Sequence, residues 1–230
     1  MEKAISLVDE AYRDIKNMIC NFELIPGQVV SDFTLSKKLG MSRTPIRQAL
    51  QRLEIDNLIE DAGAGKSYQV SQITEEEIID LFDAREGIEV MAIRVAIEKG
   101  VCETRLIELE RINRNMEDAN VAGKIKENFE LDQQFHDYLV NSSGNKKLIR
   151  FHDSILVQLR RVRMISYLER KYQDKAYRDH QKVLEGLRLG DKDLAQRALA
   201  EHIETAKQDY LRVIREKDIA EDFGMLRFFR

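Results

Sequence analysis

The sequence predicts a mainly α-helical chain in two parts, a short N-terminal part that ends in a β-hairpin and a longer part made of helices. Three observations support this fold class. Apolar residues recur at helical spacing through most of the 230 residues. Both prolines, Pro26 and Pro45, lie in the first fifth of the chain. The one pattern typical of paired strands, "LIEDAGAGKSYQV" from Leu58 to Val70, also lies near the N-terminus.

Composition narrows the class of partner. With 43% hydrophobic residues the chain can bury a core, and its net charge of −4 gives no overall field that attracts nucleic acid or membrane. An anionic partner must therefore be met by a local patch. The acidic N-terminus has no signal-peptide pattern, and nowhere do apolar residues run long enough to span a bilayer. We expect a cytoplasmic protein without a membrane partner, with Cys20 and Cys102 reduced.

The N-terminal part reads as three helices and a hairpin. The first helix runs from about Ala4 to Phe22 and is ended by "IPGQ". The second, about Ser31 to Leu39, has Ser31 as its expected N-cap and Gly40 after its end. A third follows the turn "GMS", and the hairpin comes next. This order is that of a winged helix-turn-helix domain, which we assign to residues 1–73.

The remaining residues, 74–230, show helical periodicity throughout and predict an all-helical bundle. The helices are expected at about 74–99, 103–119, 124–142, 145–171, 173–189 and 191–217. Glycine-containing breaks such as "SSGN" and "GD" separate them. The aromatic tail "EDFGMLRFFR" is expected to pack on this bundle or on a second copy of the chain.

The third N-terminal helix begins in "GMSRTPIRQALQRL" and has two different faces. Ser42 is its expected N-cap, and Pro45 is tolerated in the first turn, where backbone N–H groups have no partner within the helix. The buried stripe comprises Ile46, Leu50 and Leu53. The polar face comprises Arg43, Thr44, Arg47, Gln48 and Gln51.

This polar face is what a DNA-reading helix needs. An arginine in the first turn is unfavourable for the helix dipole, so its position is not explained by helix stability. Arginine binds guanine through two hydrogen bonds, glutamine pairs with adenine, and Thr44 with the N-terminal amides can hold a phosphate oxygen. A solvated polar face is the plain alternative. The preceding helix, the short turn and the following hairpin favour the reading of double-stranded DNA.

The stretch "SRTPIRQALQRLEIDNLI" resembles the recognition helix of the GntR family of bacterial transcription regulators. Nearly the whole chain resembles its FadR subgroup, whose all-helical effector domain (FCD) follows the DNA-binding domain. Six helices in the second part resemble the shorter, VanR-like variety of that domain. The resemblance implies that Arg43, Thr44 and Arg47 contact DNA, together with Gly65 and Lys66 in the wing turn.

Two departures from the family pattern concern the DNA sequence that is read. No arginine directly precedes Gly65, so Lys66 is the basic residue expected at the tip of the wing. Phe33 stands where some relatives carry a basic residue. The sequence of the operator cannot therefore be carried over from the family.

The four histidines all lie in the second part. Asp132 and His136 are four residues apart on one helical face, and His180 and His202 each lie on the apolar stripe of another helix. One histidine on an apolar stripe is most often a core residue, but three of them with a carboxylate favour a shared divalent metal ion. The donor set suits zinc, nickel or manganese, with coordination positions left open. Periodicity alone does not exclude His152, which lies on a similar stripe.

The resemblance implies a smaller set and a ligand. In the FadR-type domain the metal ligands match Asp132, His136, His180 and His202, which leaves His152 outside. Arg85, in "LFDAREGIEV", matches an arginine that helps to hold the carboxylate of the effector. Its alternative is a surface or salt-bridged arginine. A metal ion together with an arginine favours a small organic acid as the effector.

The sequence thus predicts a ligand-responsive transcription regulator, a repressor that binds a palindromic operator as a homodimer and is released by its effector. It does not exclude activation. One alternative is a helical metalloenzyme with an accessory N-terminal domain, although we see no inward glutamate or second base beside the ligands. A second is a direct metal sensor, in which the metal ion itself is the signal.

Overall fold

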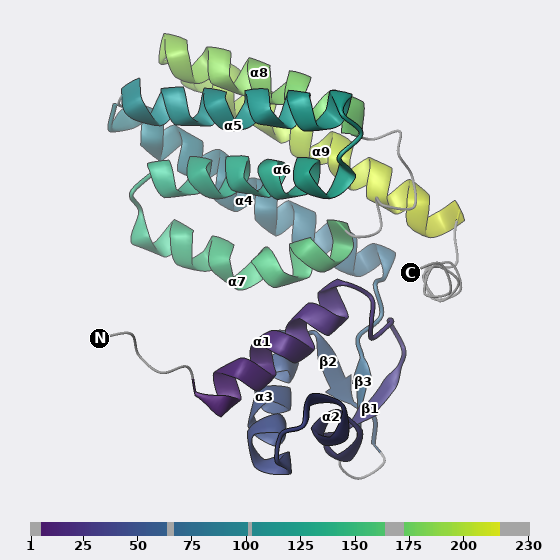
Figure 1. Ribbon diagram of the computed structural model, residues 1–230. Helices are drawn as coiled ribbons and strands as arrows, with labels where there is room; N and C mark the ends of the chain where they lie inside the picture. Colours follow the sequence, from purple (N-terminus) through teal and green to yellow (C-terminus); the bar gives the residue numbers. More distant parts are fainter. Residues whose placement is uncertain (1–5, 64–66, 101–102, 164–172, 217–230) are drawn as a thin grey trace. The chain divides into compact units, whose positions relative to one another are not determined.

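The computed structural model describes residues 6–63, 67–100, 103–163 and 173–216 (Figure 1). Gly65, Lys66, Cys102 and the aromatic tail lie outside these residues. The described chain is mainly helical, as predicted, and divides into two compact units. One contains residues 6–63, 67–74, 157–163 and 214–216, and the other contains residues 75–100, 103–156 and 173–213.

The first unit is a winged helix-turn-helix, which confirms the predicted fold class. Its elements are α1 (Leu7–Cys20), β1 (Val29–Ser31), α2 (Asp32–Leu39), α3 (Arg43–Ile55), β2 (Ile59–Asp61) and β3 (Ser67–Val70). The sheet has the order β1-β3-β2 and is antiparallel, with Val30 opposite Tyr68 and Asp61 also opposite Tyr68. The sequence predicted only the β2–β3 hairpin. Val29 of β1 lies opposite Gln69 of β3, far along the chain, so no short turn marks β1 as one strand of a hairpin.

The core of this unit lies between α1, α3 and the sheet. The predicted stripe of Ile46, Leu50 and Leu53 is fully buried, and it packs with Ile15 of α1 and Val70 of β3. Burial of an aliphatic side chain contributes about 1.5–3 kcal/mol. This stripe therefore fixes which face of α3 remains for solvent.

The N-termini of α2 and α3 differ in how they are capped. Ser31 and Thr34 form a capping box at α2, which confirms Ser31 as the N-cap, and Gly40 ends the helix at φ 67°. Ser42 occupies the N-cap position of α3, as predicted, but its side chain makes no capping hydrogen bond. The start of α3 is exposed, and water can satisfy its backbone N–H groups.

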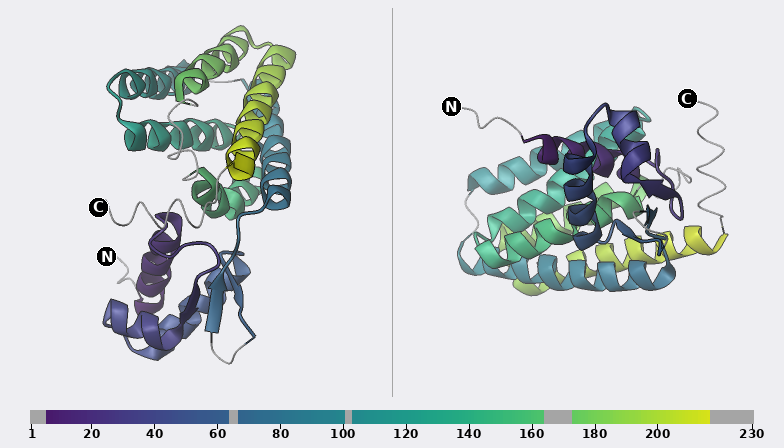
Figure 2. Two further views of the ribbon diagram at one scale, coloured as in Figure 1. Left: turned by 90° about the vertical axis from the view of Figure 1, so that its right-hand side faces the viewer. Right: turned by 90° about the horizontal axis from the view of Figure 1, so that it is seen from below.

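Six helices follow, as predicted: α4 (Glu75–Glu98), α5 (Glu103–Val121), α6 (Ile125–Ser142), α7 (Lys146–Arg163), α8 (Gln173–Leu189) and α9 (Lys192–Glu216). The predicted extension of α7 to residue 171 lies outside the described residues. α6 packs on α4 and α5, and α5 packs on α8. α9 runs along α4 in both views of Figure 2. In the described part of the chain, no helix has the length and apolar content that crossing a membrane requires.

The backbones of α8 and α9 approach each other closely at Gly186. A Cβ atom added to Gly186 would lie 2.6 Å from the backbone nitrogen and 2.7 Å from the Cα of Ala195. Because these are backbone atoms, no side chain can move aside to make room. The missing side chain thus allows the two helices that carry His180 and His202 to pack directly.

Gly186→Ala should destabilise the protein by about 1–3 kcal/mol, because the helices must separate to admit the methyl group. Gly87→Ala is the matched control, since Gly87 lies inside α4 and a Cβ there would have no neighbour within 4 Å. This control should stabilise the protein by about 0.5–1 kcal/mol through helix propensity. Urea unfolding measures both. Equal stability of the two variants would contradict the close approach.

Candidate metal centre and nucleic-acid interface

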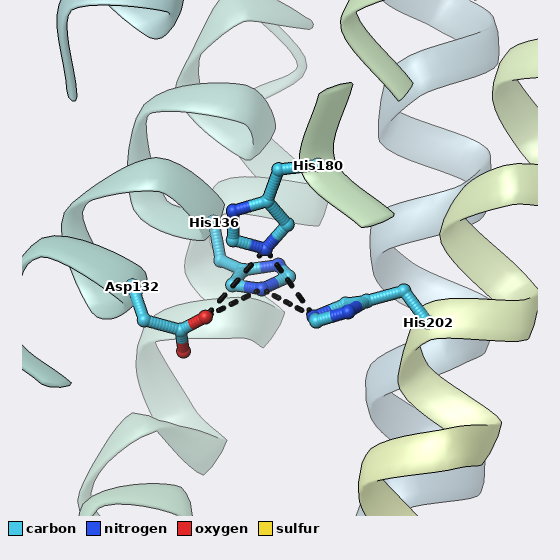
Figure 3. A group of neighbouring side chains, drawn as sticks. All are labelled: Asp132, His136, His180 and His202. Carbon is cyan, nitrogen blue, oxygen red and sulfur yellow. Dashed lines mark hydrogen bonds and ion pairs between the residues drawn. The ribbon is translucent and has the colours of Figure 1, made fainter. Parts of the chain in front are cut away.

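Four side chains from three helices converge inside the second unit (Figure 3). α6 contributes Asp132 and His136, α8 contributes His180, and α9 contributes His202. One nitrogen or oxygen from each residue lies within 4.8 Å of the others. The three imidazoles are buried, and Asp132 is partly exposed. The structure thus brings together all four residues of the predicted metal set.

The spacing of these atoms fits a single ion. The Nε2 atom of His202 is 3.3 Å from the Nε2 atoms of both His180 and His136. The Oδ1 atom of Asp132 is 3.5 Å from His180 Nε2 and 3.7 Å from His136 Nε2. Three imidazole nitrogens and one carboxylate oxygen suit a divalent transition metal.

The environment keeps imidazoles of the cluster neutral. Burial, followed by the neighbouring His202 and His136, lowers the pKa of His180 well below its ordinary value. Burial also lowers the pKa of His202, against an opposing contribution from Asp179. Neutral imidazoles have free lone pairs for an ion. The ring of His180 is stacked on that of Phe135, with 3.9 Å between the centroids.

Glu89 of α4 supports the cluster from behind. Its Oε2 lies 2.6 Å from His136 Nδ1, and its Oε1 accepts a hydrogen bond from Arg85 Nε at 2.7 Å. Burial opposes ionisation, but Arg85 and then His136 outweigh it and hold the pKa of Glu89 well below its usual value. An ionised Glu89 accepts a hydrogen bond from Nδ1–H of His136, which leaves the lone pair on Nε2, the atom that faces the other ligands.

The sequence analysis missed Glu89, and its expectation of no inward glutamate was wrong. The spacing of four residues from Arg85 was the available signal, since it places both side chains on one face of α4. The carboxylate is engaged by Arg85 and His136, so it serves as a support for the ligands.

Arg85 is a buried, salt-bridged arginine that keeps one unsatisfied donor. It is 2% exposed and is paired with Glu89, as the salt-bridged alternative predicts. Its Nη2 atom is buried and has no hydrogen-bond partner among the residues that the structure describes. The positive charge of Arg85 contributes to lowering the pKa values of His180 and His202, so it lies near the cluster. A buried N–H without an acceptor costs free energy, which a bound anion would recover.

His152 lies outside the four-residue cluster but touches its support. It is buried on α7, with Nε2 3.5 Å from Glu89 Oε1 and Nδ1 3.8 Å from Asp137 Oδ1. The structure therefore places it behind the candidate ligands. Periodicity could not separate this position from that of a ligand, because both face the interior.

The polar face of α3 forms the candidate nucleic-acid interface in the first unit. Arg43, Thr44, Gln48 and Gln51 are exposed there, and Arg47 is partly exposed. Gly65 and Lys66 of the wing lie outside the described residues. Lys37 of α2 lies with its Nζ 4.4 Å from the centroid of the Phe33 ring. The ammonium group thus lies over the aromatic residue that replaces a basic one in this chain.

Both arginines of this face bind one carboxylate that the sequence analysis did not single out. Arg43 Nη2 lies 2.5 Å from Asp32 Oδ1, and Arg47 Nε donates to Asp32 Oδ2. Asp32 is the first residue of α2 and is buried. Nothing in the spacing of 11 and 15 residues along the chain indicates these contacts.

Comparisons with known proteins identify the two domains of the chain. The model of the FCD domain matches residues 80–205, and that of "Bacterial regulatory proteins, gntR family" matches residues 7–65. The HTH-type transcriptional regulator YdhC of Bacillus subtilis strain 168 is 25% identical over 198 residues, which are 83% of this chain and 85% of YdhC. The HTH-type transcriptional repressor GlaR of Escherichia coli K12 is 26% identical over 159 residues, 68% of this chain and 72% of GlaR.

A solved structure shares the fold. The structure of E. coli McbR/YncC superimposes with a TM-score of 0.76 at 21% identity and covers 93% of this chain and 100% of its own. The relatives are transcription regulators, so the metalloenzyme alternative is set aside and the chain is a regulator. The chain belongs to the gntR family of bacterial transcription regulators and carries an FCD domain after its DNA-binding domain.

Proposed function

We propose that the protein is a repressor whose affinity for its operator is controlled by a small organic acid bound beside a divalent metal ion. One observation carries this proposal. The buried Nη2 donor of Arg85 lacks a protein acceptor within the described chain, near a cluster of four atoms spaced as metal ligands. Residues 1–73 would bind DNA, and residues 74–230 would bind the effector and form the dimer.

The metal ion would be held by Asp132, His136, His180 and His202. When bound, it would supply positive charge and an open coordination position for a carboxylate oxygen. Arg85 would donate Nη2 to the same acid while its Nε stays on Glu89. Two attachment points would orient a carboxylate and disfavour neutral ligands.

On the DNA side, Arg43, Thr44, Arg47 and Gln48 of α3 would contact the operator, together with Gly65 and Lys66 of the wing. A homodimer related by a two-fold axis would present two copies of α3 to a palindromic site. The acid would release the operator if it binds more tightly to a dimer arrangement that does not fit the DNA. The repressor name of GlaR supports the direction of this control.

Replacing both Arg43 and Arg47 by alanine should weaken operator binding by at least 10-fold, since each bidentate base contact is worth about 1–3 kcal/mol. Arg52→Ala is the matched control, because Arg52 lies on α3 but pairs with Asp9. Fluorescence anisotropy with an operator selected from a random duplex library measures the affinity. The assignment is wrong if the double variant binds like the Arg52→Ala control.

The purified protein should contain about one zinc, nickel or manganese ion per chain, and His180→Ala should lose it. Glu89→Gln should lower metal affinity by about 10- to 100-fold, because the support of His136 is weakened. Glu86→Gln is the matched control: Glu86 lies one helical turn before Glu89 and outside the cluster, so this variant should leave the metal affinity unchanged. Elemental analysis and competition with a chelator measure these effects. If the wild-type protein binds none of the three ions, the histidines are core residues and not metal ligands.

Arg85→Gln should keep the metal ion but lose release of the operator by the acid, because the neutral amide cannot pair with a carboxylate as the guanidinium does. Operator affinity would be titrated with hexuronates, hydroxy acids, dicarboxylates and amino acids, after metal content and thermal stability are checked. Unchanged release would remove Arg85 from the site. Loss of operator affinity on adding metal or chelator, with no acid present, would instead identify a direct metal sensor.

A further inference from the structure

Asp32 lies under the DNA-reading face of α3. It is the first residue of α2, directly after the Ser31 N-cap, and its side chain is 1% exposed. The two arginines that bind it have 48% and 41% of their side chains exposed. The carboxylate is thus covered by cations that themselves face the solvent. A plain surface ion pair would leave both partners exposed, and a core pair would bury both.

Asp32 is held as an anion. The hydrogen bond from Arg43 lowers the pKa of Asp32, burial opposes this, and the hydrogen bond from Arg47 adds to the lowering. A buried carboxylate is costly unless charged donors satisfy it. Two arginines with one acid leave a local charge of +1 in place of +2. Asp32 therefore reduces the attraction of this surface for any polyanion.

The atoms used by Arg47 matter for base reading. Arg47 gives its Nε to Asp32 Oδ2, which leaves both of its terminal Nη groups for other acceptors. This end of the guanidinium is the fork that fits O6 and N7 of guanine. Arg43 reaches the other carboxylate oxygen with Nη2. A long side chain otherwise loses considerable rotamer entropy when it is fixed on a base.

We propose that Asp32 is a positioning residue for DNA specificity: it orients Arg43 and Arg47 for base contacts and weakens their attraction to the phosphates of other DNA. This inference rests on the proposed DNA contacts of these two arginines. Asp32 itself need not touch the operator. Asp32 thus strengthens binding to the operator by orienting the arginines, and it weakens binding to other DNA by reducing the positive charge.

The test compares affinities of the full-length protein for the operator and for an unrelated duplex over a range of salt concentrations. Asp32→Asn should weaken operator binding about tenfold, because the orientation is lost. It should strengthen binding to the unrelated duplex, with a salt slope steeper by about 0.9, the value for one more neutralised phosphate. Glu54→Gln, which removes an exposed charge on the same α3 helix, should shift both affinities in the same direction.

Two further variants separate positioning from simple stabilisation. Asp32→Glu keeps the charge but displaces the carboxylate, so it should lower operator affinity without strengthening binding to the unrelated duplex. In an Arg47→Ala background, Asp32→Asn should lower the ratio of the two affinities much less than it does alone. The unfolding midpoint of each variant is measured alongside.

Several outcomes would overturn the inference. An unchanged affinity ratio in both Asp32 variants would do so, as would an equal effect of Asp32→Asn with and without Arg47. Either result, with a lowered unfolding midpoint, would make Asp32 a structural tie between α2 and α3. If one of these results is found and the Arg43 and Arg47 double variant still loses the operator, the proposed DNA contacts stand and only the inference about Asp32 fails. If that variant keeps the operator, the proposed DNA contacts themselves fail.

Discussion

The buried carboxylate of Glu89 is the constraint around which the candidate metal centre is arranged. A charge in a helical interior is stable only when donors surround it; Arg85 and His136 bind Glu89, and His152 lies 3.5 Å from it. By binding Nδ1 of His136, Glu89 fixes which nitrogen the imidazole presents to the other ligands. By binding Nε of Arg85, it leaves the far end of the guanidinium unpaired. One acid thereby prepares both the proposed metal ligand and the proposed effector contact.

The same device recurs in the first unit, where Asp32 lies beneath Arg43 and Arg47. In each unit a buried acid sets the direction of arginine side chains whose remaining donors are free to meet an anion. The difference lies in exposure. Arg85 is enclosed and suits a small acid, whereas the α3 arginines face the solvent and suit a large polyanion.

Periodicity predicted most of the fold, the outward-facing residues of the nucleic-acid interface and the inward-facing histidines, because the buried stripe of a helix also fixes its opposite face. It could not separate His152 from the candidate ligands, since both lie on inward stripes. Asp32 and Glu89 escaped notice for another reason. Asp32 binds arginines 11 and 15 residues away, Glu89 contacts His136 47 residues away, and one acid among 41 has no periodic signature. β1 was not predicted because its partner strand β3 is far along the chain and no hairpin turn joins the two.

The close packing at Gly186 bears on how a bound metal ion would connect the helices of the second unit. α8 and α9 meet backbone to backbone there, close to the turn that joins them, and they carry His180 and His202, while Asp132 and His136 belong to α6. An ion held by all four side chains would tie α6 to both of these helices. Because such an ion is bound by the folded chain and released on unfolding, the free energy of unfolding would rise with the concentration of free metal.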